Sequence, residues 1–287
     1  MIDSHQHVFW HGRDDHGLAA DMDVHGIEQA WLLTWEVPAE HFDPANAGLL
    51  NPVHIRPDGT HPGIPLSDLL IAREHYPEKF LVGYCPNPAM PNAADVLESA
   101  VRIHDVRVCG EWKFRMLIDD PRCIELFRRA GSLGLPVVLH LDVPWIGGEY
   151  QPHWHGGTIE NLERALVACP QTNFIGHAPG FWREIAAESD NSGKYPMGPV
   201  TAPGRLGPLF ERNPNLFADL SAQSGLNALR RDPEHALGFL ERFGDRLLFG
   251  RDYYGAELAE FLAGLGLSRA LMNRIGDRNA RGLLPGS

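Results

Sequence analysis

Short apolar segments alternate with helical patterns along almost the whole chain, and this alternation restricts the fold more than any other feature. Eight segments are rich in aliphatic, β-branched and aromatic residues, and they are apolar runs rather than strict alternations of apolar and polar residues. They span residues 2–9, 30–37, 80–86, 106–114, 136–142, 172–177, 216–220 and 246–252. Runs of this kind are typical of strands in a parallel sheet that is covered on both faces. We therefore predict eight parallel strands.

The segments between these strands carry signals for helix starts. Asp120 stands before Pro121, and proline is favoured at the first position of a helix, so a helix is predicted to begin there. Thr158 is expected to cap a helix over 158–168. A further helix is expected over 233–242.

Eight strands separated by helices in fewer than 300 residues favour one architecture. We predict a (β/α)8 TIM barrel that forms a single domain over residues 1–287, with long loops at the C-terminal face. An open, doubly wound sheet is the alternative.

The composition excludes some classes of partner. The net charge of -12 disfavours binding to nucleic acid or to anionic membranes, because both need a basic surface. No signal peptide is visible, and no run approaches the ~18 apolar residues of a membrane span. The four cysteines form no CxxC pair. We therefore expect a cytoplasmic protein with reduced thiols.

Side chains that bind metals fall at the same end of several predicted strands. In a TIM barrel, the C-terminal strand ends and the loops after them carry the chemistry. Side chains two residues apart on a strand point the same way, so the two histidines of the first strand share one direction. Imidazoles and carboxylates gathered at one end are ligands for zinc, manganese or a similar ion. The residues concerned are His5, His7, Glu111, His140, His177 and Asp252.

Each of these residues also has a purely structural interpretation. His140 can be a core histidine bonded to the backbone, and His177 can cap a turn. Asp252 can be the N-cap of the next helix. A metal site is favoured because separate structural explanations would each have to place a ligand-type residue at the same strand end.

Two long loops interrupt the pattern of strands and helices, over residues 38–66 and 143–157. Loops of this length usually border a site or form a lid. The second loop contains another His-x-His pair, His153 and His155. No strand fixes the geometry of this pair, so we expect it to contact substrate from a lid rather than to bind a metal.

Taken in order, the motifs resemble the amidohydrolase superfamily of metal-dependent TIM-barrel enzymes. The similarity rests on IDSHQH, GEWKFR, VVLHLD, FIGHAPGFW and LLFGRD at five strands, and on NRIGDRNARGLL near the end of the chain. The branch that the chain resembles most is amidohydrolase 2. That branch includes decarboxylases of the aminocarboxymuconate-semialdehyde and orsellinate type, and various lactonases.

The resemblance implies a ligand set and a catalytic base. His5, His7, His140 and His177 would lie around a divalent ion, with zinc as the expected ion and manganese as the alternative. Asp252 would bind both the ion and the reactive water, and would act as the general base.

The fourth strand and the loops supply candidates for substrate binding. Glu111 is either a further ligand or a partner of Lys113. Lys113 and Arg115 either hold a substrate carboxylate or form ordinary ion pairs. Trp182 is either part of an apolar wall for a ring-bearing substrate or cover over the core. Arg251 is expected to turn away into a structural ion pair.

Three functions fit these residues. The first is hydrolysis of a small-molecule amide, lactone or ester through a metal-activated water. The second is non-oxidative decarboxylation of a small carboxylic acid. The third is a barrel that binds a metal or small ligand without turnover. By analogy with relatives in the branch, a homodimer is expected.

Overall fold

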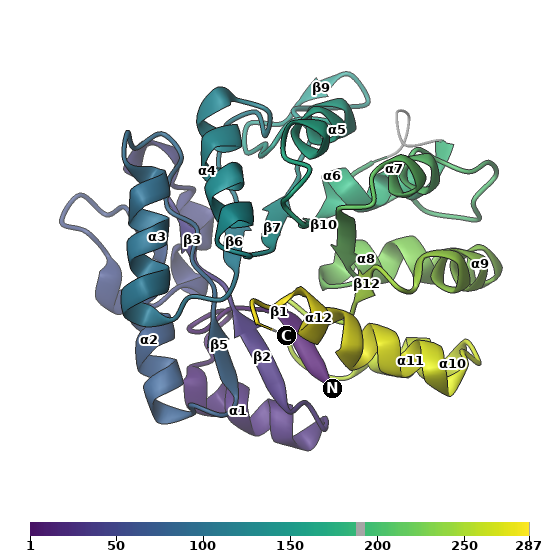
Figure 1. The fold of residues 1–287 in the computed structure, drawn as a ribbon, viewed down its shortest axis with the longest axis horizontal. Coiled ribbons are helices and arrows are strands. Elements are labelled where there is room, and N and C mark those ends of the chain that lie inside the picture. Colours follow the sequence, from purple (N-terminus) through teal and green to yellow (C-terminus); the bar gives the residue numbers. More distant parts are fainter. Residues whose placement is uncertain (188–192, 287) are drawn as a thin grey trace.

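The computed structural model, which describes residues 1–187 and 193–286, contains a ring of eight parallel strands with helices outside it (Figure 1). Three strands form one arc in the order β1–β2–β5, and five form a second arc in the order β12–β11–β10–β7–β6. The strands are β1 (Ile2–Gln6), β2 (Gln29–Leu32), β5 (Phe80–Val82), β6 (Cys109–Trp112), β7 (Val137–His140), β10 (Phe174–His177), β11 (Leu216–Asp219) and β12 (Leu247–Leu248). All eight predicted strands are present, and each is shorter than predicted.

Backbone hydrogen bonds join the two arcs at both of their edges. Between β5 and β6, the amide of Tyr84 donates to the carbonyl of Val108 at 2.9 Å. Between β1 and the end of β12, the amide of Ser4 donates to the carbonyl of Phe249 at 2.9 Å. The first and last strands of the chain are therefore neighbours, as the predicted barrel requires.

The helices cover the outside of the ring. The two predicted caps are confirmed: the Asp120 side chain accepts from the backbone amide of Arg122, which follows Pro121, and Thr158 forms a reciprocal capping pair with Asn161. The helices of the barrel wall are α1 (Asp15–Val24), α2 (Leu66–His75), α3 (Ala93–His104), α4 (Pro121–Ser132), α5 (Ile159–Ala168), α6 (Pro179–Trp182), α7 (Leu206–Arg212), α8 (Ala222–Arg230), α9 (Pro233–Phe243), α10 (Glu257–Gly264) and α11 (Arg269–Asn273).

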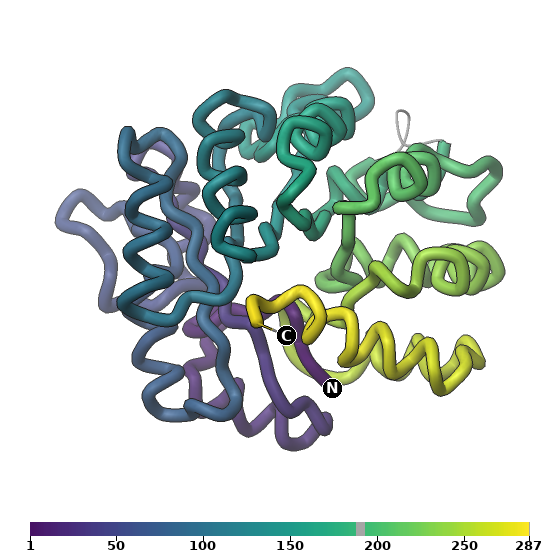
Figure 2. The backbone as a smooth tube through the Cα atoms, in the orientation of Figure 1, coloured from purple at the N-terminus to yellow at the C-terminus, as the bar shows by residue number. Residues whose placement is uncertain are grey.

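Apolar side chains fill the barrel interior at the N-terminal end of the strands. The cluster consists of Ile2, Trp31, Leu33, Val108, Val138, Ile175 and Leu248. Helix α12 (Asn279–Leu283) closes this end, because its Ala280 and Leu283 pack against the same cluster. Figure 2 shows this last part of the chain lying across the middle of the ring. Only the opposite end of the interior is left for polar side chains.

Two strands change register where their polar side chains enter the interior. Ile2 and His5 are three residues apart, and so are Val108 and Glu111, although a regular strand returns to the same face every two residues. The β1–β2 and β6–β7 pairings both contain a register shift at these points. The shifts turn His5 and Glu111 toward the other polar side chains of the interior.

The two long loops carry short elements of their own. β3 (Trp35–Glu36) pairs antiparallel with β4 (Gly63–Ile64), which lies in the first loop. In the second loop, β8 (Trp145–Ile146) and β9 (Glu149–Tyr150) form a hairpin. The prediction of one continuous strand over 30–37 is wrong for its second half, because β3 leaves the barrel to pair with the loop.

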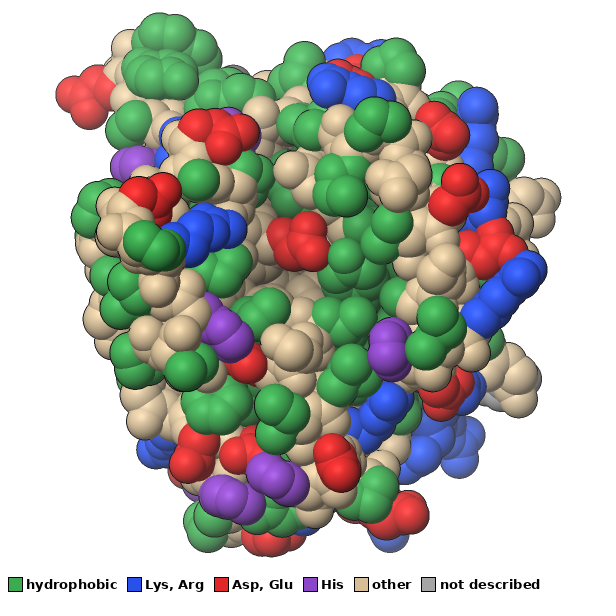
Figure 3. All heavy atoms as spheres, turned by 90° about the vertical axis from the view of Figure 1, so that its left-hand side faces the viewer, with side chains coloured by type: hydrophobic (Ala, Val, Ile, Leu, Met, Phe, Trp, Pro, Cys, Tyr) green, Lys and Arg blue, Asp and Glu red, His purple; other side chains and the backbone are tan. Residues whose placement is uncertain are grey.

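The surface carries side chains of mixed polarity, and the cysteines form no disulfide among the described residues. On the side formed by α2 and α3, hydrophobic side chains are scattered among charged ones (Figure 3). The four cysteines are buried, free thiols. Within the part of the chain that the structure describes, no helix has the length and apolar character needed to cross a bilayer.

Arg251 belongs to a buried ion network that ties the ends of the barrel sequence together. Its Nε lies 2.7 Å from Asp3 Oδ2 on β1, and its Nη1 lies 2.5 Å from Asp21 Oδ2 on α1. Asp3 is fully buried and Arg251 is 6% exposed. The predicted structural role of Arg251 is therefore confirmed.

Replacing this arginine is expected to be costly. Arg251→Ala leaves the buried carboxylate of Asp3 without its cation, so the free energy of unfolding should fall by about 3–5 kcal/mol in urea denaturation. The control is Arg122→Ala, which removes an exposed pair with Asp120 and should cost about 0–1 kcal/mol. Equal losses in the two variants would contradict the assignment.

Candidate metal centre

Five of the six predicted ligands meet at the C-terminal ends of the strands. They are His5, His7, Glu111, His177 and Asp252. The carboxylates of Glu111 and Asp252 each lie 3.5–4.0 Å from the Nε2 atoms of all three histidines. All of these side chains except Asp252 are buried. Residues from three strands and the last strand-end loop thus surround one point.

The hydrogen bonds of the three imidazoles turn their Nε2 atoms toward that point. His7 Nδ1 lies 2.8 Å from the carbonyl oxygen of Leu33. A carbonyl only accepts, so Nδ1 carries the proton and Nε2 presents a lone pair in the neutral ring. The Nδ1 atoms of His5 and His177 lie 3.0 and 2.9 Å from the two oxygens of Asp219. Metal-binding histidines are oriented by outer partners in this way.

Asp219 is the functional residue that the sequence analysis missed. It is fully buried at the end of β11, and Ser221 Oγ also lies 2.5 Å from its Oδ1. Its position in LFADL, at the end of a predicted strand, was a usable signal. Asp219 orients two ligands but does not face the centre itself. A search for residues that could bind the metal directly therefore does not select it.

The donor atoms at the centre fit a divalent cation. His5 Nε2, Glu111 Oε2 and Asp252 Oδ1 are buried and have no hydrogen-bond partner among the described residues. Ligands about 2.0–2.2 Å from an ion stand roughly 3–3.5 Å apart, so an ion here requires a contraction of only a few tenths of an ångström. Buried polar atoms without partners are costly, and an ion would satisfy all three.

The backbone at Asp252 is strained, which is common at functional sites. Its φ is 52°, in the left-handed region that side-chain-bearing residues rarely adopt. Its amide donates to the carbonyl of His5 at 2.8 Å, which fixes the residue against β1. The side chain is 19% exposed. Asp252 therefore touches both the buried centre and the open mouth.

The carboxylates give the centre a strongly negative electrostatic potential. Burial by itself would lower the pKa of His5, but Asp219, with Asp252 and Glu111, outweighs burial and raises it to about 10. Burial by itself would raise the pKa of Glu111, but Lys113 and His140 hold it well below the usual range. The protonated imidazole of His5 thus offsets part of the negative charge of the carboxylates. A bound cation would replace this proton and supply the positive charge instead.

His140 departs from its predicted role as a ligand of the same centre. Its Nδ1 lies 2.7 Å from Glu111 Oε1, and its Nε2 lies 2.8 Å from Asp142 Oδ2. Both ring nitrogens are therefore engaged, and His140 orients Glu111 from outside the five-residue cluster. His155 joins this group, with its Nδ1 3.2 Å from Asp142 Oδ2.

The geometry of His155 is fixed by a contact that the sequence did not reveal. The backbones of Asp142 and His155 exchange two hydrogen bonds, at 2.8 and 3.0 Å, and this pairing returns the second long loop to the end of β7. His140, Asp142 and His155 thereby form a second group with donor atoms within 4.8 Å of one another. His153 lies apart from this group, near Asp43.

The predicted substrate-binding residues have other partners. Lys113 Nζ lies 4.3 Å from the centre of the Trp35 ring, at the edge of the site. Arg115 Nη2 lies 3.0 Å from the carbonyl oxygen of His41 and 2.6 Å from His153 Nδ1, so it joins the two long loops.

Trp182 does not form a wall facing the mouth. It is 1% exposed, and its indole Nε1 donates to the carbonyl of Asp219 at 2.9 Å. The prediction of a substrate contact is corrected because the residue lies beneath the strand ends, where it supports β11.

One cavity opens beside Asp252 of the centre, and a second opens beside Asp142. The larger has a volume of about 490 Å³ and is lined by Asp252, Trp10, His11, Tyr195 and Tyr253, among others. The smaller, of about 180 Å³, is lined by Asp142, His153 and Lys194, among others. The first volume lies in the range of small-molecule sites.

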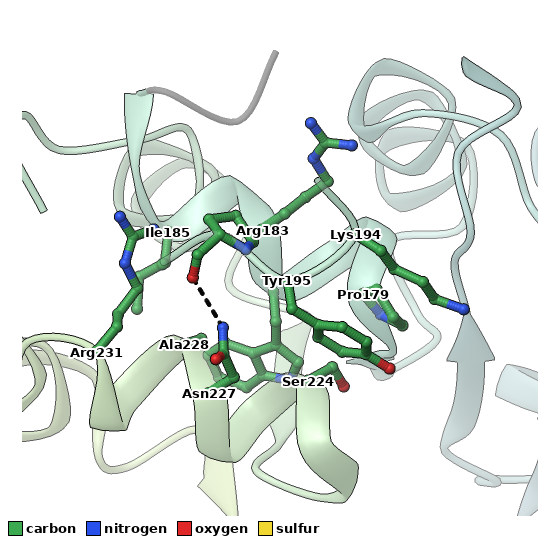
Figure 4. A pocket seen from close by; sticks show the side chains of 11 residues that line it. Pro179, Arg183, Ile185, Lys194, Tyr195, Ser224, Asn227, Ala228 and Arg231 are labelled. Carbon is green, nitrogen blue, oxygen red and sulfur yellow. Dashed lines mark hydrogen bonds between the residues drawn. The ribbon is translucent and has the colours of Figure 1, made fainter. Parts of the chain in front are cut away.

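A third cavity behind Tyr195 is too small to hold a substrate. Its volume is about 10 Å³, which is room for one water at most. Figure 4 shows the Tyr195 ring extending over Ser224, while Lys194 points away from it. Asn227 Nδ2 donates to the carbonyl of Pro196 at 3.0 Å and thereby holds the segment that carries Tyr195.

Comparison by sequence gives no assignment. No protein-family description matches the chain. No curated protein matches it either.

Comparison by structure finds TIM-barrel proteins. An uncharacterised TIM-barrel protein from Bordetella bronchiseptica is 20% identical with a TM-score of 0.62, over 93% of this chain and 81% of that one. A dihydroxybenzoic acid decarboxylase from Polaromonas sp. JS666, with bound manganese and 2-nitroresorcinol, is 18% identical with a TM-score of 0.60, over 98% and 96%. A Pseudomonas putida protein assigned as a 2-pyrone-4,6-dicarboxylic acid hydrolase is 16% identical with a TM-score of 0.58, over 98% and 96%.

These likenesses confirm the predicted TIM-barrel fold. The decarboxylase and the hydrolase belong to the amidohydrolase 2 branch, which is the branch that the sequence motifs resemble. The two proteins are named for different reactions on the same fold, so the fold alone does not select one reaction.

Asp219→Asn is expected to weaken metal binding. Asparagine keeps the shape but cannot accept from two imidazole N–H groups as a carboxylate does, so His5 and His177 lose their orientation. The affinity for zinc should fall about 10- to 100-fold in a competition titration with a chelating dye. Asp245→Asn removes the same charge at an exposed position and serves as the control. Unchanged affinity in Asp219→Asn would contradict the role of Asp219.

Metal binding should also release a proton. Because the pKa of His5 is raised from 6.5 to about 10, metal-free protein holds this proton at pH 7–8, and a bound cation expels it. The apparent affinity should therefore rise about tenfold per pH unit between pH 6.5 and 8.5. Calorimetry in buffers of different ionisation enthalpy measures the released proton directly. Heats that do not depend on the buffer would count against this account.

Proposed function

We propose that this protein is a metal-dependent enzyme that hydrolyses an amide, lactone or ester bond of a small molecule. One observation carries the proposal. Three unpartnered, buried donor atoms converge at the open end of the barrel, and the residue that supplies one of them, Asp252, also lines a cavity large enough for a substrate.

A divalent ion held by these residues would lower the pKa of a water molecule from ~15.7 toward ~7 and polarise a carbonyl group. His5, His7 and His177 would supply nitrogen ligands, and Glu111 would supply an oxygen. Asp252 would accept the proton of the attacking water at its carboxylate. The same carboxyl group would then donate the proton to the leaving oxygen or nitrogen.

Zinc is the ion that we propose first. The donor set mixes imidazole nitrogen with carboxylate oxygen, which suits zinc and also manganese. Manganese is the alternative because the dihydroxybenzoic acid decarboxylase from Polaromonas sp. JS666 contains it.

Decarboxylation is the second candidate. It is supported by the decarboxylases among the structural neighbours and by Lys113, a half-buried cation whose charge acts on both Glu111 and His140. In this reaction Lys113 would hold or steer the departing carboxylate. Asp252, in its protonated form, would deliver a proton to the carbon atom from which CO₂ leaves.

Metal analysis followed by a substrate panel tests both candidates. Purified protein is analysed for bound metals, loaded with zinc or manganese, and assayed on lactones, esters, amides and aromatic acids with detection of CO₂. Acid release without CO₂ supports hydrolysis, whereas CO₂ release supports decarboxylation. Protein that neither contains nor takes up a divalent ion, and shows no activity with added zinc or manganese, would remove both candidates.

Asp252→Asn should separate metal binding from turnover. Asparagine retains an oxygen ligand but cannot accept a proton, so metal content should stay within about twofold while turnover falls about 10²- to 10⁴-fold. Mass spectrometry of the metal and steady-state kinetics give the two readouts, with Asp245→Asn as the control. A variant with undiminished turnover would defeat the assigned role of Asp252.

A further inference from the structure

We propose that the cavity beside Asp252 binds an uncharged aromatic group of the substrate and disfavours a carboxylate. The proposal rests on the proposed function, because it takes Asp252 as the edge of the reacting site. The cavity measures about 490 Å³, whereas an apolar cavity of about 150 Å³ already holds a benzene ring. A ring with substituents therefore has room.

Aromatic side chains form a continuous wall from the metal centre into this cavity. The ring of Trp10 lies 5.9 Å from that of the candidate ligand His7, and 4.4 Å from that of His11. The ring of His11 lies 5.0 Å from that of Tyr253, which it meets edge to face. A ligand reacting over Asp252 would extend along this wall, and its ring could stack on it.

Other residues that line the cavity are also apolar. Leu220, Leu226 and Leu258 line it, and Tyr195 contributes a further ring. The indole Nε1 of Trp10 is closed off from solvent, so Trp10 contributes apolar ring surface to the cavity.

The charges around the cavity are unfavourable for an anion. Its carboxylates are Asp252 and Glu257. Arg251 pairs with Asp3 and Asp21 through Nε and Nη1, and its Nη2, which has no partner among the described residues, is closed off from solvent. Glu257 faces the exposed Arg230 at 3.9 Å. Burial lowers the pKa of His11, which leaves this ring uncharged at neutral pH.

The smaller cavity has the opposite character. Lys194 and Arg183 line it, and Lys194 Nζ lies 3.6 Å from Asp142 Oδ1. Basic side chains thus line one cavity, together with Asp142, and aromatic side chains line the other. A substrate with one anionic end and one uncharged ring matches this asymmetry, whereas a ring that carries a second carboxylate does not.

Binding of three probes tests the proposal by calorimetry. On zinc-loaded protein, isophthalate should bind about tenfold more weakly than benzoate, because its second carboxylate enters the aromatic cavity. On metal-free protein, the uncharged probe benzamide should bind. Tyr253→Ala should weaken benzamide binding about 3- to 10-fold, while Tyr253→Phe, which keeps the ring, should not.

A variant that adds a positive charge to the cavity should reduce the discrimination against the second carboxylate. Gln223 is exposed and lines the same cavity, so Gln223→Arg adds a cation there without disturbing the core. In this variant, the ratio between the affinities for benzoate and isophthalate should fall at least about threefold. Equal binding of the two acids to the wild-type protein would overturn the proposal, and so would benzamide binding that is indifferent to Tyr253→Ala. If the protein binds no metal, the proposed function fails, yet the benzamide arm still decides whether the cavity takes an uncharged ring.

Discussion

The geometry of the candidate metal centre depends on one buried carboxylate, Asp219. A fully buried carboxylate is tolerated only when it is hydrogen-bonded, and Asp219 is bonded to His5, His177 and Ser221. These contacts lower its pKa despite burial, which opposes them. Because both imidazoles give their Nδ1 protons to the same group, both present Nε2 to the interior. One aspartate thereby sets the direction of ligands from two different strands.

The barrel makes this arrangement possible by bringing the two ends of the chain together. β1 lies beside the last strand, so the carbonyl of His5 can hold the strained backbone of Asp252. The ion network of Arg251 secures the same seam from the outer side. Below the centre, the interior is packed with apolar side chains and closed by α12. The polar groups are therefore confined to one end, where burial strengthens their interactions.

The sequence revealed the strand count, the helix caps and five residues of the cluster, because these features depend on local patterns. The sequence did not reveal the features that depend on tertiary contacts. The inward positions of His5 and Glu111 depend on register shifts that no periodicity predicts. His155 gains its place by backbone pairing with Asp142, and the ring of His140 lies between Glu111 and Asp142. Trp182 looked like a loop residue, but packing puts it beneath β11.

Hydrolysis and decarboxylation make similar demands on such a centre, and proteins named for each reaction are among the structural neighbours. In the proposed mechanisms, each reaction uses a cation to polarise the substrate and a carboxyl group that can move a proton. Under the proposed function, what differs is the bond that would lie over Asp252, and the cavity that Asp252 lines would position that bond. Loops rather than strands line much of both cavities. A change of loop can therefore change the reaction while Asp219, the histidines and the barrel remain as they are.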